Sequence, residues 1–223
     1  MSCAVALWDL DGTIARSEEG IFNSIIYAAE KMGLPSPDRS ALRPFIGPPL
    51  QYSFEKYFGL SAAEGAKAVT FYREYYSVKG IFECGIYPGV EKALSKLRSA
   101  GVTVALATSK PEIYAERILK RFGLSEYFNA VYGADMTPQS SDKSAVVARA
   151  LKGCAVSDKS RAAMAGDKSH DVIGAKNNGI VCVGALYGYG GRKELEESGA
   201  DYLAESPEEV AEILLNRVYV QGN

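Results

Sequence analysis

Short, continuous apolar segments recur along the chain, separated by longer stretches in which apolar and polar residues are mixed. Each of these segments is a run rather than an alternation, and such runs are typical of strands buried on both faces, as in parallel sheets. We therefore expect strands at residues 3–8, 102–107, 130–133, 162–165, 180–185 and 201–204.

The stretches between these strands carry helical patterns with recognisable ends. Residues 111–122 begin with a proline, a favoured first-turn residue, and stop at Gly123. Residues 143–151 follow Asp142, a residue type that caps helix N-termini. Alternating strands and helices predict an α/β fold with a doubly wound (Rossmann-like) parallel sheet. The remaining helices are expected at residues 90–100, at 171–178 and from 207 onward, after Ser206.

The alternation stops between residues 15 and 86, where no convincing strand pattern is present. An apolar-faced helix is expected at residues 21–32, and a tyrosine-rich helical stretch at residues 69–78. We predict that residues 15–86 form an all-helical cap domain, inserted into an α/β catalytic core made of residues 1–14 and 87–223.

Composition and charge narrow the class of protein without giving its function. The chain has 223 residues, 47% of them hydrophobic, and a formal net charge of −2 at pH 7. It lacks the basic excess that marks nucleic-acid-binding domains, and no apolar run approaches the ~18 residues of a membrane span. We therefore expect neither nucleic acid nor a membrane as a partner.

The cysteines and the single histidine exclude several kinds of site. The four cysteines contain no Cys-x-x-Cys pair, and the first apolar run is too short for a signal peptide. Together these features indicate a reduced, cytoplasmic protein. His170 alone cannot supply the two or three imidazoles of most catalytic zinc sites, so such a site is not expected within one chain.

The segment Asp9-Leu10-Asp11-Gly12-Thr13 follows the first expected strand. Ligands of open α/β sheets bind at the carboxyl ends of strands, and alternation along an extended chain puts Asp9 and Asp11 on the same side. Gly12 permits a sharp exit that leaves both carboxylates exposed. A strand-end Asp-x-Asp can also be no more than a turn signal, so this pair alone leaves both interpretations open.

Other polar residues lie where later strands end. The strand at 102–107 is followed by Thr108-Ser109, directly before a helix whose free N–H groups and dipole favour an anion. Asp167 and Asp171 follow a later strand, and Lys143 begins a helix between these two strand ends. We expect these groups to converge with the first pair of aspartates.

Four carboxylates at one edge of a sheet would repel each other. Each close pair costs ~4 kcal/mol at an effective dielectric constant of 20, and a divalent cation would offset this repulsion. Oxygen ligands suit Mg²⁺, which also bridges to substrate phosphate. We therefore predict Mg²⁺ as cofactor and a phosphoryl group as ligand, with one carboxylate as nucleophile and another as acid or base.

In order and spacing, these segments resemble the four motifs of the haloacid dehalogenase superfamily, and the resemblance covers nearly the whole chain. The predicted cap is similar to the small helical cap of the phosphoglycolate phosphatase-like branch. The resemblance implies a Mg²⁺-dependent phosphatase that hydrolyses a small, phosphoglycolate-like phosphomonoester through an aspartyl phosphate. The motif residues are Asp-Leu-Asp-Gly-Thr at 9–13, Thr108-Ser109, Lys143 and Gly-Asp-Lys-Ser-His-Asp at 166–171.

The resemblance also implies a role for each motif residue. Asp9 would attack phosphorus, and Asp11 would protonate the leaving oxygen and then deprotonate water. Thr108 and the backbone at Ser109 would bind phosphoryl oxygens, and Lys143 would neutralise charge on Asp9 and the phosphoryl group. The implied ligands of Mg²⁺ are Asp9, the carbonyl oxygen of Asp11, Asp167 and Asp171, the last directly or through a water.

Other residues compete for parts of these roles. Lys110 also places a cation beside Thr108, but the third motif of the family lies later in the chain, which favours Lys143. The stretch Gly188-Tyr189-Gly190-Gly191-Arg192 lacks the lysine–hydroxyl pair of a phosphate-binding loop, so we favour a glycine-rich turn near the site. His170 is interpreted as a loop residue rather than a general base.

Within the cap, we expect Arg43, Phe45 and Gly47 to govern substrate specificity, because the corresponding segment closes over the active site in similar enzymes. The expected partner is a small phosphorylated metabolite, and the expected assembly is a monomer or weak dimer. Three other functions stay open. They are a 5'-nucleotidase acting on nucleoside monophosphates, a phosphomutase of the β-phosphoglucomutase kind, and a phospho-aspartate signalling module.

Overall fold

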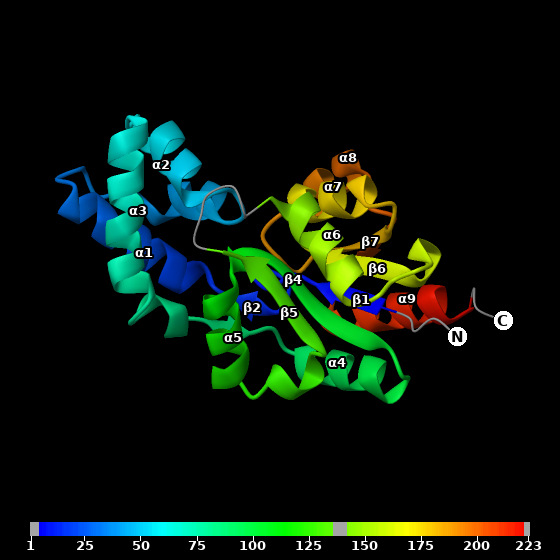
Figure 1. Ribbon diagram of the computed structural model, residues 1–223. Helices are drawn as coiled ribbons and strands as arrows, with labels where there is room; N and C mark the ends of the chain where they lie inside the picture. The colour runs from blue at the N-terminus through cyan, green and yellow to red at the C-terminus, as the bar shows by residue number, and fades with distance from the viewer. Residues whose placement is uncertain (1–4, 136–141, 221–223) are drawn as a thin grey trace. The chain divides into compact units, whose positions relative to one another are not determined.

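The computed structural model (Figure 1) describes residues 5–135 and 142–220, and the chain divides into two compact units. The larger unit consists of Met1–Ala15 and Ile86–Asn223, and the smaller unit of Arg16–Gly85. The domain borders predicted from the sequence lie one residue away from these divisions.

The larger unit is built on a parallel sheet whose six strands have the order β5-β4-β1-β6-β7-β8. This order, with helices in the connections, confirms the doubly wound α/β fold. Residues 3 and 4 of the first predicted strand lie outside the described residues. The strands are β1 (Val5–Trp8), β4 (Thr103–Pro111), β5 (Ala130–Ala134), β6 (Ala162–Gly166), β7 (Val181–Ala185) and β8 (Tyr202–Ala204).

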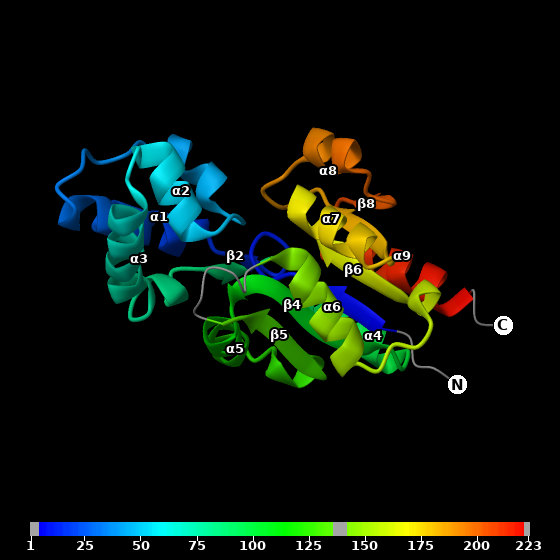
Figure 2. The ribbon, with the colours of Figure 1, turned by 45° about the horizontal axis from the view of Figure 1, so that its top comes forward.

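Helices cover both faces of this sheet, as Figures 1 and 2 show. On one face, α6 (Lys143–Gly153) packs against α7 (Ser169–Asn177), which in turn contacts α8 (Arg192–Ser198). On the other face, α4 (Val90–Ser99) packs against α9 (Pro207–Val220), and α5 (Glu112–Arg121) lies along β4 and β5. Among the described residues, no helix has the length and apolar character needed to cross a membrane.

The central strand β1 explains the continuous apolar pattern. Val5 and Leu7 lie in one buried cluster with side chains of α6 and α7. Ala6 and Trp8 point to the opposite face because side chains alternate along a strand, and both are fully buried. Burial of a side chain such as Leu7 contributes about 1.5–3 kcal/mol. Both faces of the strand therefore need apolar residues.

Two helix starts bear on the site. Asp142 caps α6 as predicted, since its Oδ1 accepts a hydrogen bond from the N–H of Ala145 at 2.8 Å. Pro111, in contrast, is not a first-turn residue: it ends β4 with a ψ of 129°, and α5 begins at Glu112. The residue before a proline is restricted to extended conformations, which keeps Lys110 in the strand.

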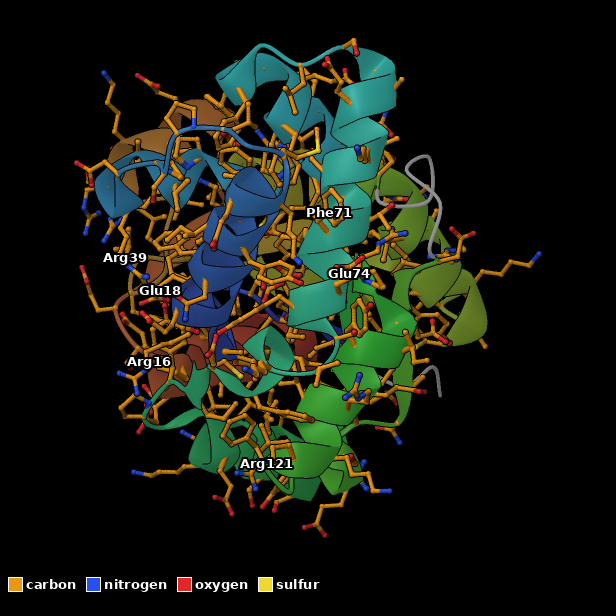
Figure 3. All side chains as sticks on the ribbon, turned by 90° about the vertical axis from the view of Figure 1, so that its left-hand side faces the viewer. Arg16, Glu18, Arg39, Phe71, Glu74 and Arg121 are labelled. Carbon is orange, nitrogen blue, oxygen red and sulfur yellow. The ribbon has the colours of Figure 1, made fainter. Side chains whose placement is uncertain are left out.

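The smaller unit is mostly helical, and α1 (Glu18–Lys31) and α3 (Ala62–Tyr76) lie side by side in it. Figure 3 labels Glu18 on α1 and Glu74 on α3. The expectation of no strand between residues 15 and 86 is wrong in one detail, because β2 and β3 pair where the chain passes between the units. Two residues per strand are too few to give a periodic pattern. The elements are β2 (Ala15–Arg16), α1 (Glu18–Lys31), a 3-10 helix (Arg39–Phe45), α2 (Leu50–Phe58), α3 (Ala62–Tyr76), a second 3-10 helix (Gly80–Phe82) and β3 (Gly85–Ile86).

Candidate active site

Three buried carboxylates meet at the carboxyl ends of β1 and β6. These strands are neighbours, and the N–H of Asp9 donates to the carbonyl oxygen of Ala165 at 2.9 Å, which brings Asp9 beside Asp167. Asp171 lies in the first turn of α7. One carboxylate oxygen of each of the three aspartates lies within 4.8 Å of the others. Their exposed fractions are 7% for Asp9, 0% for Asp167 and 1% for Asp171.

Lys143 joins two of these carboxylates. Its Nζ lies 2.7 Å from Asp9 Oδ1 and 2.8 Å from Asp171 Oδ1, and it donates to the carbonyl oxygen of Ala107 at 3.1 Å. The lysine side chain passes close to α7, where a Cβ on Gly174 would lie 2.7 Å from Lys143 Cγ. A glycine at position 174 therefore leaves the space that the lysine needs.

Lys110, the competing lysine, has a different partner. Its Nζ lies 2.7 Å and 3.0 Å from the two carboxylate oxygens of Asp11, and both side chains are largely buried. The Asp11 carboxylate thus forms an ion pair outside the group of three. Asp11, the fourth aspartate of the predicted cluster, lies at this end of the sheet, but Lys110 neutralises its charge.

Thr108 and Ser109 lie in β4, two and three residues beyond the last residue of β4 that pairs with β1. Thr108 is buried, and its Oγ1 accepts a hydrogen bond from the N–H of Lys110 at 3.2 Å. Ser109 is half-buried. Both residues lie shortly before the N-terminal end of α5, which begins at Glu112.

Burial and like charges raise the pKa values of Asp9 and Asp167. Burial raises the pKa of Asp9 to about 6; Lys143 opposes this increase and Asp171 adds to it. Burial, Asp171 and Asp9 raise the pKa of Asp167 well above its usual value. Burial alone would lower the pKa of Lys143, but Asp171 and Asp9 outweigh burial and raise it. Lys143 therefore stays charged, whereas ionisation of Asp9 and Asp167 is costly.

The charges of this group fit a divalent cation. Three carboxylates and one ammonium group leave two negative charges in a buried space, and the ligand atoms are all oxygen. Mg²⁺ prefers oxygen ligands and would offset both the burial and the repulsion that raise the pKa values of Asp9 and Asp167. The residues present can therefore hold Mg²⁺.

Other predicted residues lie elsewhere. His170 is exposed, and its Nδ1 is 3.5 Å from Ser169 Oγ. Arg43, Phe45 and Gly47 belong to the smaller unit, where Arg43 and Gly47 are exposed but Phe45 is only 3% exposed. The Phe45 ring packs 5.2–5.9 Å from the rings of Phe54, Tyr57 and Phe58. A role in specificity stays a prediction for all three.

Sequence reasoning missed several supporting residues. Glu194 accepts hydrogen bonds from the N–H of Ser169 at 2.9 Å and from Lys168 Nζ at 3.1 Å. Tyr187 donates to the carbonyl oxygen of Thr13 at 3.0 Å, although 174 positions separate them. The glycine-rich stretch beside Tyr187 was the only signal for these contacts in the sequence.

Comparisons with known proteins identify the family of this chain. Residues 6–185 match the family model of haloacid dehalogenase-like hydrolases. A 5'-nucleotidase of Pseudomonas aeruginosa is 35% identical over 189 residues, which cover 85% of each chain. A phosphoglycolate phosphatase of Vibrio parahaemolyticus is 29% identical over 215 residues, which cover 93% of this chain and 94% of the relative.

The fold has a close match among solved structures. The crystal structure of a predicted phosphatase from Clostridium acetobutylicum superposes with a TM-score of 0.91 at 36% identity, covering 96% of this chain and all of the other. The family model and the fold agree on the family. The chain belongs to the haloacid dehalogenase-like hydrolases and is an enzyme that acts on phosphoric monoesters.

Proposed function

We propose that the protein is a Mg²⁺-dependent phosphatase that hydrolyses a small, phosphoglycolate-like phosphomonoester through an aspartyl phosphate on Asp9. The observation that carries this proposal is the contact of Lys143 with both Asp9 and Asp171, inside a group of three buried carboxylates. An ionised nucleophile thereby lies beside oxygens that can bind a cation.

In the first proposed step, a carboxylate oxygen of Asp9 attacks phosphorus. The bond between phosphorus and the leaving oxygen breaks, and Asp11 gives a proton to that oxygen. Asp11 can carry this proton only when its ion pair with Lys110 opens in the substrate complex. The pKa of Asp9 near 6 supports its role, because most of the group is ionised at pH 7 and above. Lys143 neutralises charge that would otherwise repel the phosphoryl group.

In the second proposed step, the ionised Asp11 takes a proton from water, and the water oxygen attacks phosphorus. The bond between phosphorus and Asp9 breaks, which releases inorganic phosphate and restores the carboxylate. Thr108 and the backbone at Ser109 would hold the phosphoryl oxygens through both steps. Positioning and charge neutralisation of this kind supply most of the catalysis in phosphoryl transfer.

Asp9, Asp167, Asp171 and the carbonyl oxygen of Asp11 are the proposed ligands of Mg²⁺. When bound, the cation neutralises phosphoryl charge and holds the phosphoryl group against the nucleophile. The acidic group described above supports this assignment. The proposed partner is a small phosphorylated metabolite, while cytoplasmic location and a monomer or weak dimer stay predictions.

A phosphate-release screen over small phosphomonoesters, with and without Mg²⁺, tests the proposal. The wild type should release phosphate only with the cation, and Asp9→Asn should abolish release while folding normally. Asp158→Asn is the matched control: Asp158 is exposed and caps a short 3-10 helix, which asparagine also caps. Phosphate release by Asp9→Asn at the control rate would refute the aspartyl phosphate.

A 5'-nucleotidase is the second candidate, favoured by the 35% identity to the Pseudomonas aeruginosa relative. The screen should therefore contain 2-phosphoglycolate and nucleoside 5'-monophosphates, compared by kcat/KM. A higher value for nucleotides would select this candidate. A phosphomutase would instead isomerise a sugar phosphate without releasing phosphate, and a signalling module would hold its aspartyl phosphate without turnover.

A further inference from the structure

Residues 186–191 connect β7 to α8, and the first five of them, residues 186–190, are called the glycine loop here because they contain Gly188 and Gly190. In the structure this loop lies against Asp167. The N–H of Tyr189 donates to Asp167 Oδ2 at 2.7 Å. Thr13 Oγ1 donates to the other carboxylate oxygen, Oδ1, at 3.3 Å. A donor therefore holds each oxygen of the Asp167 carboxylate.

The glycines of this loop make room for Asp167. A Cβ on Gly188 would overlap the Asp167 side chain, lying 2.6 Å from its Oδ2, and would also overlap the carbonyl oxygen of Gly12 in the turn after β1. A Cβ on Gly190 would overlap the Asp167 carbonyl oxygen. Gly188 does not have a positive φ. Position 188 thus requires glycine for space and not for backbone conformation.

The loop is itself anchored on both sides. The hydroxyl of Tyr187 donates to the carbonyl oxygen of Thr13 at 3.0 Å, which ties the loop to the turn after β1. The N–H of Leu186 donates to the carbonyl oxygen of Ala204 at 2.9 Å, which ties it to β8. Beyond the loop, Glu194 in the first turn of α8 holds Ser169. These contacts fix the loop relative to the strand ends.

We infer that the glycine loop positions the Asp167 carboxylate for the cation and thereby sets the affinity of the enzyme for divalent metal. Tyr189 N–H and Thr13 Oγ1 each donate to one oxygen of the Asp167 carboxylate, so its orientation depends on these two donors. Groups that orient a metal ligand typically change metal affinity 10–100-fold when they are altered. The loop is then a positioning element and not a phosphate cradle. This inference rests on the proposed Mg²⁺-dependent function.

Metal binding, measured apart from turnover, tests the inference. Mn²⁺ binding to the whole chain is followed by electron paramagnetic resonance, with Mg²⁺ as competitor. Gly188→Ala should raise the Kd for both cations about 10–100-fold, because the new methyl group displaces Asp167. Product inhibition by inorganic phosphate, measured at saturating Mn²⁺, should change less than about threefold.

Gly191→Ala is the matched control. Gly191 has a φ of +81°, so alanine strains the backbone there, but a Cβ would meet no atom within 4 Å. Its Kd for Mn²⁺ should equal that of the wild type. If Gly188→Ala does not fold, Thr13→Val replaces it, since valine removes the donor to Asp167 Oδ1 at similar volume; a raised Kd is expected again.

Several outcomes would overturn the inference. A folded Gly188→Ala, or Thr13→Val in its place, with the wild-type Kd would do so, as would equal weakening by Gly191→Ala, which would point to backbone strain. Weaker inhibition by phosphate at an unchanged Kd would identify a phosphate cradle instead. If the wild type binds no Mn²⁺, the proposed metal site does not exist, and the inference fails together with the proposed function.

Discussion

Lys143 and Lys110 are two buried lysines at the carboxyl end of one sheet, and they contact different carboxylates. Lys143 Nζ lies 2.7 Å from Asp9 and 2.8 Å from Asp171, whereas Lys110 Nζ lies 2.7 Å from Asp11. Around Lys143, three carboxylates outnumber one ammonium group, but the charges of Lys110 and Asp11 balance. A divalent cation would therefore reduce the charge repulsion around Lys143, but it has no excess negative charge to neutralise around Lys110.

This difference also separates two catalytic tasks. In the proposed mechanism Asp9 forms the bond to phosphorus, and Asp11 moves the proton of the leaving group. Loss of Lys143 should therefore affect every substrate, while loss of Lys110 should depend on how much the leaving group needs a proton.

The largest effect is expected for Lys143→Ala. Without the ammonium group, the repulsion between Asp9 and Asp171 is uncompensated and phosphoryl charge is no longer neutralised. We expect kcat/KM to fall about 10²–10³-fold or more, equally for alkyl and aryl phosphates. Steady-state phosphate release measures this. Near-normal turnover in the folded variant would show that the charge of Lys143 is not needed for phosphoryl transfer.

The next largest effect is expected in the pH dependence of the free energy of unfolding. The folded pKa of Asp9, about 6, exceeds the unfolded value of 3.8, so the folded state binds more protons between these pH values. Stability of the metal-free protein should therefore fall as pH rises from about 4 to 6 and stay reduced above. The loss is about 3 kcal/mol, or roughly 6–12 °C in Tm.

Thermal unfolding in a chelator at several pH values measures this loss, with Asp9→Asn as the control that lacks the titrating group. Mg²⁺ should restore more stability at pH 8 than at pH 5, because it binds the ionised carboxylates. If the Tm of the wild type follows that of Asp9→Asn at every pH, the pKa of Asp9 is not raised in the folded protein.

Lys110→Ala should give a smaller effect that depends on the leaving group. The Lys110 ammonium contacts both oxygens of Asp11 and fixes the orientation of that carboxylate. We expect about a 10–10²-fold loss of kcat for an alkyl phosphate, whose leaving oxygen must be protonated. For p-nitrophenyl phosphate, which needs no proton donor, the loss should stay under about threefold.

Lys110→Arg sharpens this test, since arginine also donates two hydrogen bonds to a carboxylate. It should recover part of the activity on the alkyl phosphate. Equal losses on both substrates would mean that Lys110 acts on the phosphoryl group or on folding, and the two lysines would then share one role.

The residues around Lys143 could be predicted from the sequence because each has a local signal. Asp9 and Asp167 directly follow apolar runs, and Asp142 caps the helix that begins with Lys143. Parallel strands bring their carboxyl ends to one edge, so positions far apart in the chain converge without further information.

The contacts of Lys110 and of the glycine loop have no such signal. Extended geometry places Asp11 on the side of Asp9, but it does not choose between Lys143 and Lys110 as its partner. The bond from Tyr189 to Asp167 uses a backbone N–H, which any residue except proline supplies. In the smaller unit, the aromatic cluster that buries Phe45 arises from packing between the 3-10 helix and α2.

The smallest effect is expected for Arg43→Ala. Arg43 has the same charge as Lys143 and Lys110, but it lies at an exposed position in the smaller unit. An exposed ion pair contributes at most about 1 kcal/mol, so KM for 2-phosphoglycolate should rise up to about fivefold if Arg43 binds its carboxylate. The kcat for p-nitrophenyl phosphate should not change, because Arg43 lies outside the group around Lys143. Ser40→Ala, on the same 3-10 helix, is the control. A fall in kcat on both substrates would mean that Arg43 takes part in the reaction itself. An exposed cation would then have a catalytic effect like that of the two buried lysines.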